Sequence, residues 1–262
     1  MRSTWSGAIS LGLLTVPVDL FTGTIDEKIG FRQMCPKHKC PIQQRTFCLT
    51  GGEPVERGDL VKGFEVEPGK FVILTEDDLA RAALPLGKVL EIEVCVPEAE
   101  IDPRTFHSAY IALPPKKDPR RNYALIHETL AKTAHVGVGR IALRTKQHIA
   151  AVRVIGPYLA VHLMHWPNEL RPLDAYALPP AVTPKPAEVA LAEQLVAAYA
   201  GRYDAATFID QHRENVMQLI IARARGEAEV TFEEPEERAD SGADIMALLE
   251  ASITAGRNRK AA

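Results

Sequence analysis

The chain of 262 residues contains no long hydrophobic run, only 6% aromatic residues and only four cysteines. No apolar stretch reaches the roughly 18 residues that a transmembrane helix needs, so we expect no membrane partner. The apolar residues 8–21 follow Arg2, but glycine, proline and aspartate interrupt them, and we do not expect a signal peptide. Three of the four cysteines are crowded together, which suits reduced thiols in the cytoplasm better than a disulfide framework.

The sequence also lacks the short motifs of common enzymes. It contains no Gly-x-Gly-x-x-Gly, no Gly-x-x-x-x-Gly-Lys-Ser/Thr and no Gly-x-Ser-x-Gly. His127 and Glu128 begin like a zinc-protease helix, but Ala131 stands where the second imidazole is needed. His162 and His165 are an odd number of residues apart on an expected strand, so they point to opposite faces and do not readily share a metal. We therefore do not expect an enzyme.

Acidic residues are missing from one long stretch. Between Glu128 and Glu169 there are 40 residues without a carboxylate, and they include five lysines and arginines and four histidines. Residues 1–103 carry a net charge of −5 and residues 172–262 carry −6, whereas residues 104–171 carry +8. A solvated face can explain a short basic run, but a stretch of this length predicts a polyanionic partner, which we interpret as nucleic acid.

The most basic part of this stretch has no aromatic side chain. Residues 137–157 contain no Phe, Trp or Tyr, so the stacking platforms typical of single-strand binders are missing there. Arg140 and Arg144 share one face of an expected strand, while Ile141 and Leu143 point into a core. Long cations without aromatics predict contacts to the phosphates of a duplex and no reading of bases.

The chain is predicted to be strand-rich first and helical afterwards. A helix is expected over Arg121–Ala134 within the strand-rich part, because its apolar residues recur at three- and four-residue steps. Short β-branched runs bounded by turn residues predict the strands, over residues 3–20, 71–74, 90–96, 140–144 and 158–164. A proline-rich connector after Leu178 precedes the predicted helices, over residues 187–200, 205–225 and, with Ser241 as N-cap, 244–252.

A cluster of soft and borderline ligands lies near the N-terminus. Cys35, His38, Cys40 and Cys48 fall within 14 residues and could close a tetrahedral zinc site. Such a site would be structural, because four protein ligands leave no open position for catalysis. The second cysteine pair of a zinc ribbon is incomplete, since Gly51 stands at its last position. The alternative is that these are reduced cysteines in a hairpin loop.

Four segments, in this order, resemble bacterial Ku, the DNA-end-binding family of non-homologous end joining. They are Arg2-x-x-Trp5-x-Gly7-x-Ile9-x-x-Gly12-Leu13-x-x-Val16-Pro17-Val18-x-Leu20; Lys62-Gly63-Phe64-Glu65 with Phe71 to Leu79 after it; Gly139 to Lys146; and Glu169-Leu170-Arg171-Pro172. The resemblance covers nearly the whole chain.

The resemblance implies an α+β fold: a strand-rich β-barrel core with a bridging basic hairpin and a C-terminal helical arm. It divides the chain into the barrel core with its DNA-encircling bridge (1–178), the helical arm (179–237), and an acidic linker with a short helix and small basic tail (238–262). It further implies a homodimeric ring that threads onto double-stranded DNA ends, recruits an ATP-dependent DNA ligase and works in the cytoplasm at the nucleoid. No cofactor for catalysis is implied, and the lysine-rich tail of some members is short here.

The candidate sites follow from the charge distribution and the helical pattern. The DNA-binding residues are expected to be Lys116, Lys117, Arg120, Arg121, Lys132, Arg140, Arg144, Lys146 and Arg153. The last predicted helix offers an apolar side for a partner, formed by Ile245, Leu248, Leu249 and Ile253. Packing of this helix on its own protein is an equal alternative. Two rival functions are a zinc-ribbon-containing, sequence-specific DNA-binding regulator and a hydrolase that uses histidines on nucleic acid.

Overall fold

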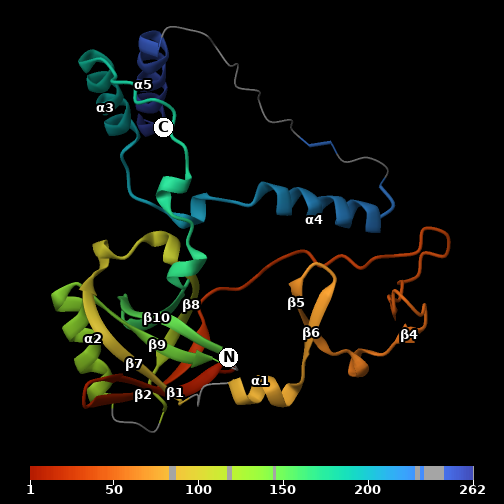
Figure 1. The fold of residues 1–262 in the computed structure, drawn as a ribbon. Coiled ribbons are helices and arrows are strands. Elements are labelled where there is room, and N and C mark those ends of the chain that lie inside the picture. Colours follow the sequence, from red (N-terminus) through yellow and green to blue (C-terminus); the bar gives the residue numbers. More distant parts are fainter. Residues whose placement is uncertain (83–86, 117–119, 144–145, 228–230, 233–244, 262) are drawn as a thin grey trace. The chain divides into compact units, whose positions relative to one another are not determined.

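The computed structural model describes residues 1–82, 87–116, 120–143, 146–227, 231–232 and 245–261 (Figure 1). The chain divides into two compact units, Met1–Ala175 and Tyr176–Ala262. The expected end of the core at residue 178 lies close to this division. No helix among the described residues is long and apolar enough to span a bilayer.

The first unit contains a closed β-barrel of seven strands (Figure 1). Their order around the barrel is β1-β2-β8-β11-β10-β9-β7. Neighbouring strands are antiparallel except β1 and β7, which run parallel and close the barrel. The strands are β1 (Trp5–Leu11), β2 (Leu14–Thr22), β7 (Val89–Pro97), β8 (Phe106–Leu113), β9 (His135–Leu143), β10 (Lys146–Ile155) and β11 (Tyr158–Met164). This confirms the α+β class with a barrel core.

Apolar residues alternate along the strands, so that every second side chain points into the barrel interior. In β2, Val16, Val18 and Leu20 are all at most 2% exposed, while the residues between them are less buried. The turn before β2 contains Gly12 at a φ of +58°, a backbone conformation that L side chains rarely adopt. The predicted strand over residues 3–20 is therefore a hairpin of two strands.

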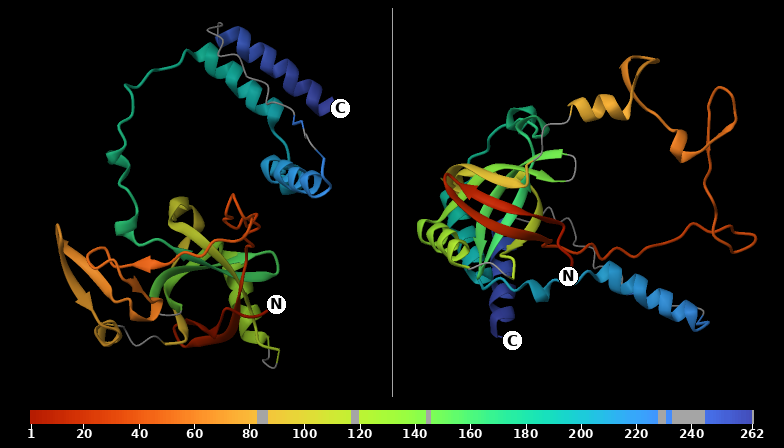
Figure 2. Two further views of the ribbon diagram at one scale, coloured as in Figure 1. Left: turned by 90° about the vertical axis from the view of Figure 1, so that its right-hand side faces the viewer. Right: turned by 90° about the horizontal axis from the view of Figure 1, so that it is seen from below.

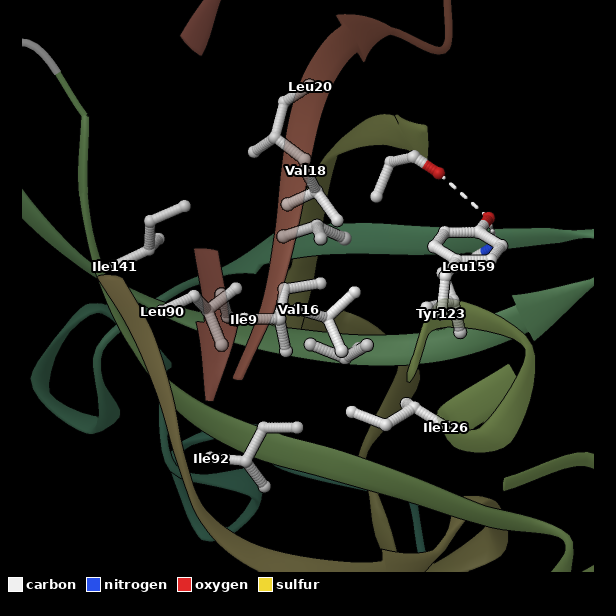
Figure 3. Packing of buried hydrophobic residues seen from close by; sticks show 14 of the residues in the cluster. Ile9, Val16, Val18, Leu20, Leu90, Ile92, Tyr123, Ile126, Ile141 and Leu159 are labelled. Atoms are coloured by element: carbon white, nitrogen blue, oxygen red, sulfur yellow. Dashed lines mark hydrogen bonds between the residues drawn. The ribbon is translucent and has the colours of Figure 1, made fainter. Parts of the chain in front are cut away.

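Helix α2 (Arg121–Thr133) contributes to the same core, as its apolar spacing predicted (Figure 3). Its buried side chains are Tyr123, Ile126 and Leu130, which recur at three- and four-residue steps along one side of the helix. The helix ends at Ala134, which takes the left-handed conformation with a φ of +53°.

A second, smaller apolar cluster lies apart from the main core of the barrel. Val136, Ala151 and Met164 are buried in it, and Ile101 and Phe106 pack against it. Along β10 these residues alternate with the core residues, so the cluster lies on the outward face of the sheet. The short 3₁₀ helices that follow β7 in this unit are η2 (Glu98–Glu100), η3 (Pro103–Thr105), η4 (Pro167–Glu169) and η5 (Leu173–Ala175).

Between β2 and β7 the chain forms small elements that pair only with each other. β3 (Thr46–Phe47) pairs with β4 (Pro54–Val55), and β5 (Lys62–Glu67) pairs with β6 (Lys70–Leu74). The 3₁₀ helix η1 (Arg57–Asp59) and helix α1 (Glu76–Ala82) accompany them. Only β6 of these was predicted from the sequence.

The second unit is helical. It contains α3 (Pro186–Tyr199), the 3₁₀ helix η6 (Ala205–Thr207), α4 (Gln211–Ala224) and α5 (Ile245–Ala261). Helices α3 and α5 pack against each other (Figure 2). The single helix expected over residues 205–225 is wrong, because Asp204 and Asp210 each cap a separate helix through backbone N–H groups. The last helix extends to Ala261, beyond the predicted end at residue 252.

Candidate nucleic-acid interface

The stretch without carboxylates forms the end of α2 and the three consecutive strands β9, β10 and β11. In β9, Ile141 is 1% exposed and Leu143 is 8% exposed, which confirms that they point into the core. In β10, Ala150 and Val152 are fully buried in the same core. Both strands thus belong to the barrel wall, where they pair antiparallel.

Two expected DNA contacts lie exposed on this wall. The Arg140 side chain is 55% exposed, and its Nε lies 3.3 Å from a carboxylate oxygen of Glu93 on β7. Lys146 is exposed at the start of β10. A salt bridge between exposed groups contributes little, so Arg140 can exchange Glu93 for a phosphate at small cost. Arg144 and Lys117 were also expected to contact DNA, but they lie outside the described residues.

Further cations surround α2. Lys116, Arg120 and Arg121 are exposed just before the helix or at its first residue. Lys132 Nζ lies 2.7 Å from a carboxylate oxygen of Glu128, one turn earlier. This hydrogen bond raises the pKa of Lys132 and lowers the pKa of Glu128. Lys132 is therefore a paired cation on an exposed helix face.

Arg153 does not fit the expected role of a cation on an open wall. Its side chain is only 23% exposed and forms an ion pair with Glu98. The guanidinium also lies over the Phe106 ring, 5.7 Å from the ring centroid. A cation held between a carboxylate and an aromatic face supports packing of the outward cluster, so we correct its assignment as a DNA contact.

Three histidines that no sequence motif indicated lie in a row at one rim of the barrel. The ring centroids of His107 and His165 are 4.8 Å apart, and those of His107 and His148 are 6.4 Å apart. His165 Nδ1 also lies 3.3 Å from a carboxylate oxygen of Glu169. We call His107, His148 and His165 the histidine row. The fourth relevant imidazole, His162, points to the other face as predicted, where its ring contacts Phe106.

Burial disfavours charge on two members of the histidine row, His107 and His148. Desolvation lowers the pKa of His107, and the neighbouring His165 and His148 lower it further, while Glu169 opposes them. Desolvation also lowers the pKa of His148, and Lys146 adds to this effect. The Glu169 carboxylate accepts a hydrogen bond from the Trp166 N–H, which lowers its own pKa.

Three of the four predicted zinc ligands lie in one turn, in which the backbone N–H of Cys35 donates to the Cys40 carbonyl at 2.8 Å. Cys35 Sγ lies 3.5 Å from His38 Nδ1. Cys48 instead accepts a contact of 3.5 Å from the Gly51 N–H, and the Glu53 carboxylate takes the space that a side chain at position 51 would fill. Across the described ranges, no group of three or more His, Cys, Asp or Glu is placed to hold a metal ion.

These residues therefore do not fit the predicted four-ligand zinc site of Cys35, His38, Cys40 and Cys48. Its physical weakness is the missing second cysteine at position 51. None of the four cysteines forms a disulfide in the structure.

The apolar side of the last helix is divided between packing and solvent. Ile253 is 7% exposed, whereas Leu248 is 42% exposed. Leu249 is half-buried, and the side chain of Ile245 is outside the described set. Because α5 packs against α3, the structure supports the alternative that this helix docks on its own protein. The assignment of Ile253 to a partner surface is corrected.

A family model for the Ku70/Ku80 beta-barrel domain matches residues 10–192. The "Non-homologous end joining protein Ku" of Streptomyces griseus is 34% identical over 260 residues, which is 99% of this chain and 65% of that relative. The protein of the same name from Mycolicibacterium smegmatis is 33% identical, with 99% and 84% covered. That from Mycobacterium tuberculosis H37Rv is 34% identical, with 97% and 96% covered.

The chain thus spans just under two thirds of the Streptomyces relative and nearly all of the M. tuberculosis relative. The matched region includes the strands β2 to β11 of the closed barrel. Sequence motifs, barrel and relatives agree, and the chain belongs to the Ku family.

Proposed function

We propose that this protein binds double-stranded DNA ends without sequence preference and acts in non-homologous end joining, as a homodimeric ring and without catalysis of its own. The observation that carries the proposal is similarity over 97–99% of the chain to curated proteins named for end joining. We place this activity in the cytoplasm, at the nucleoid.

The exposed cations support binding to the phosphate backbone. Duplex DNA carries one charge per roughly 1.7 Å, and a protein that holds any broken end must read phosphates and not bases. Arg140 and Lys146 on the barrel wall, together with Arg120 and Arg121 at the start of α2, are exposed and suit this task. These contacts carry no sequence information.

The β5–β6 hairpin supports the homodimer. Phe64 lies opposite Val72 on one face, and Phe71 and Ile73 lie on the other. In the single chain these four side chains are 47–65% exposed. An isolated two-stranded hairpin with two uncovered apolar faces is marginal in water. A second copy of the chain is the occupant that would bury both faces and close a ring.

The proposal also includes a partner enzyme. End joining finishes with a new phosphodiester bond, and we assign its formation to an ATP-dependent DNA ligase that this protein recruits. Leu248 on the exposed side of α5 is one candidate contact. Ile253 is excluded from this surface because it is buried.

The rival regulator would need a helix that reads bases, and α2 does not supply one. Its apolar side is buried in the core, and the Asn122 amide donates to the Thr15 carbonyl at 3.4 Å. A side-chain amide held by the backbone in this way does not aim at a base edge.

The test compares linear duplex with a covalently closed circle of identical sequence as competitors for a labelled linear duplex. Linear DNA is expected to compete regardless of its end sequence, and the circle is expected to compete poorly, because a ring has no end to enter. Equal competition by the circle would contradict threading while leaving general DNA binding intact. No binding to either DNA would contradict the proposed function.

A further inference from the structure

We propose that the histidine row is a proton-dependent phosphate contact: it takes up protons when the DNA backbone binds, so that the grip on DNA tightens as pH falls. This inference rests on the proposed function and adds a regulation to it. It concerns other residues than Arg140 and Lys146, the cations proposed above to contact the phosphates.

Strand register builds the row across three adjacent strands. Ile149 of β10 pairs with Met164 of β11, and Met164 pairs with Phe106 of β8 beyond a register shift. His148 precedes Ile149, His165 follows Met164, and His107 follows Phe106. The backbone N–H of His165 donates to Thr105 at 2.7 Å, which fixes the end of β11 against the start of β8. The row is therefore set by barrel strands and not by a free loop.

The imidazoles remain accessible to a ligand. His107 is exposed, and His148 and His165 are partly exposed. His107 Nδ1 lies 2.8 Å from the Ser108 hydroxyl. Three imidazoles side by side at the rim of the barrel present several ring nitrogens to the phosphate backbone of DNA. A protonated histidine donates hydrogen bonds from both ring nitrogens.

The charges around the row favour an anion. Lys146 lies near His148 and lowers its pKa, so the two would carry like charge. Arg104, which precedes Thr105 in the sequence, donates from Nη1 to the backbone carbonyl of Arg171 at 3.3 Å. Among the described residues, Glu169 is the carboxylate in direct contact with the row, and its hydrogen bond to the Trp166 N–H holds it at one end. Arg104 also forms an ion pair with Asp102 and so offsets the charge of that carboxylate.

The physical reason for proton uptake is that a phosphate changes the surroundings of the imidazoles. Without DNA, protonation of His107 and His148 is opposed first by burial and then by neighbouring positive charge. A phosphate within contact distance reverses the sign of this interaction and raises the pKa of each imidazole it touches. Each proton that is taken up on binding changes the affinity about tenfold per pH unit over the window in which it titrates.

The first experiment uses the unmodified full-length protein. Its affinity for a short blunt-ended linear duplex is measured by fluorescence anisotropy between about pH 6 and pH 8 at constant salt, with a chelator present throughout. We expect affinity to rise by about tenfold to a hundredfold as pH falls over this range. Calorimetry in buffers of different ionisation enthalpy then counts the protons taken up. Tight binding without net uptake would overturn the inference and leave the proposed function standing.

Two variants and a control assign the effect to the row. The triple variant His107→Gln, His148→Gln, His165→Gln is expected to bind like the unmodified protein at about pH 8 and to lose most of the gain at about pH 6. His148→Lys supplies a permanent cation and should bind tightly at both pH values. His212→Gln on α4 is the matched control and should keep the full pH dependence.

Each outcome decides between distinct explanations. An unchanged pH dependence in the triple variant would overturn the inference, and so would pH dependence that appears only with added Zn²⁺, since the row would then be a metal site. Absence of DNA binding at every pH would instead contradict the proposed function. Circular dichroism of the triple variant confirms that it is folded, and the His148→Lys variant keeps the test valid if it is not.

Discussion

The Tyr123 hydroxyl accepts a hydrogen bond of 2.7 Å from the backbone N–H of Leu159 (Figure 3). The same hydroxyl donates to the carbonyl of Ala112 at 2.9 Å. Leu159 and Ala112 are paired residues of β11 and β8, so one side chain of α2 links the helix to two neighbouring strands. Burial raises the pKa of Tyr123, so the phenol stays protonated and can donate.

We therefore predict that Tyr123→Phe destabilises the barrel. The change removes no apolar contact but leaves a buried N–H and a buried carbonyl without this partner, which costs about 1–3 kcal/mol. Chemical denaturation followed by circular dichroism measures the change. An exposed tyrosine in the second unit provides the control, and Tyr203→Phe should change stability by less than about 0.5 kcal/mol. Equal effects of the two substitutions would show that the link is unimportant.

Stability without DNA should fall in mild acid. The pKa of His162 is lowered, first by burial and then by Arg153, and the pKa values of His107 and His148 are also lowered from the ordinary 6.5. The unfolded chain then binds more protons than the folded one below about pH 6.5, so stability rises with pH through the window just below 6.5 and levels off above it.

His162→Phe tests this assignment, because it removes the titrating group and keeps an aromatic ring beside Phe106. When the pH is lowered from about 7 to about 5.5, the melting temperature of the variant should decrease by less than that of the unmodified protein. His212→Gln should leave the loss unchanged. A steeper loss in His162→Phe than in the unmodified protein would refute the sign.

The alternation of apolar and polar residues predicted those strands in which every second residue faces the core. β2 buries every second residue, as does β9 from Gly137 onward, and α2 buries residues at helical spacing, so these elements could be found from the sequence. β8 was not predicted, because its residues Ser108, Ala109 and Ala112 weaken the contrast between its two faces. The parallel contact of β1 with β7 that closes the barrel joins residues far apart in the chain and has no local signal.

The candidate site shows the same limit. Exposure of Arg140 opposite the buried Ile141 follows from period-two alternation and was predicted. The ion pair of Arg153 with Glu98 and the contact of His107 with His165 depend on strand register and a register shift, which the sequence does not reveal. The closely spaced cysteines predicted a metal cluster, but in the described residues their side chains do not converge as a group of three or more ligands.

Arg140 and Arg153 differ in exposure, so replacing each of them with alanine should have a different effect. Arg140→Ala should weaken binding to all duplex sequences alike and reduce the slope of log K against log salt by about one, since one phosphate contact is lost. Arg153→Ala should leave that slope nearly unchanged and lower stability, because Glu98 and Phe106 lose their partner. Lys146→Ala is expected to follow Arg140→Ala. A change in sequence preference in any of the three would indicate base readout.

The last helix contains two residues that separate internal packing from partner binding. Ile253→Ala should destabilise the second unit by about 2–5 kcal/mol, because it leaves a cavity where α5 packs against α3. Leu248→Ala removes an exposed side chain and should change stability by less than about 0.5 kcal/mol. Thermal unfolding of both variants measures these differences.

Measuring how strongly the protein stimulates the ligase distinguishes two roles of this helix, packing on α3 and contact with the ligase. If α5 only packs on α3, Leu248→Ala joins DNA ends with the ligase as well as the unmodified protein, and deletion of residues 238–262 acts through lower stability of the second unit. If the exposed side of α5 contacts the ligase, Leu248→Ala reduces joining while stability and end binding stay unchanged. We expect the second result, because Leu248 remains 42% exposed after the helix has packed on its own protein. Normal joining by this variant would remove the helix from the partner surface.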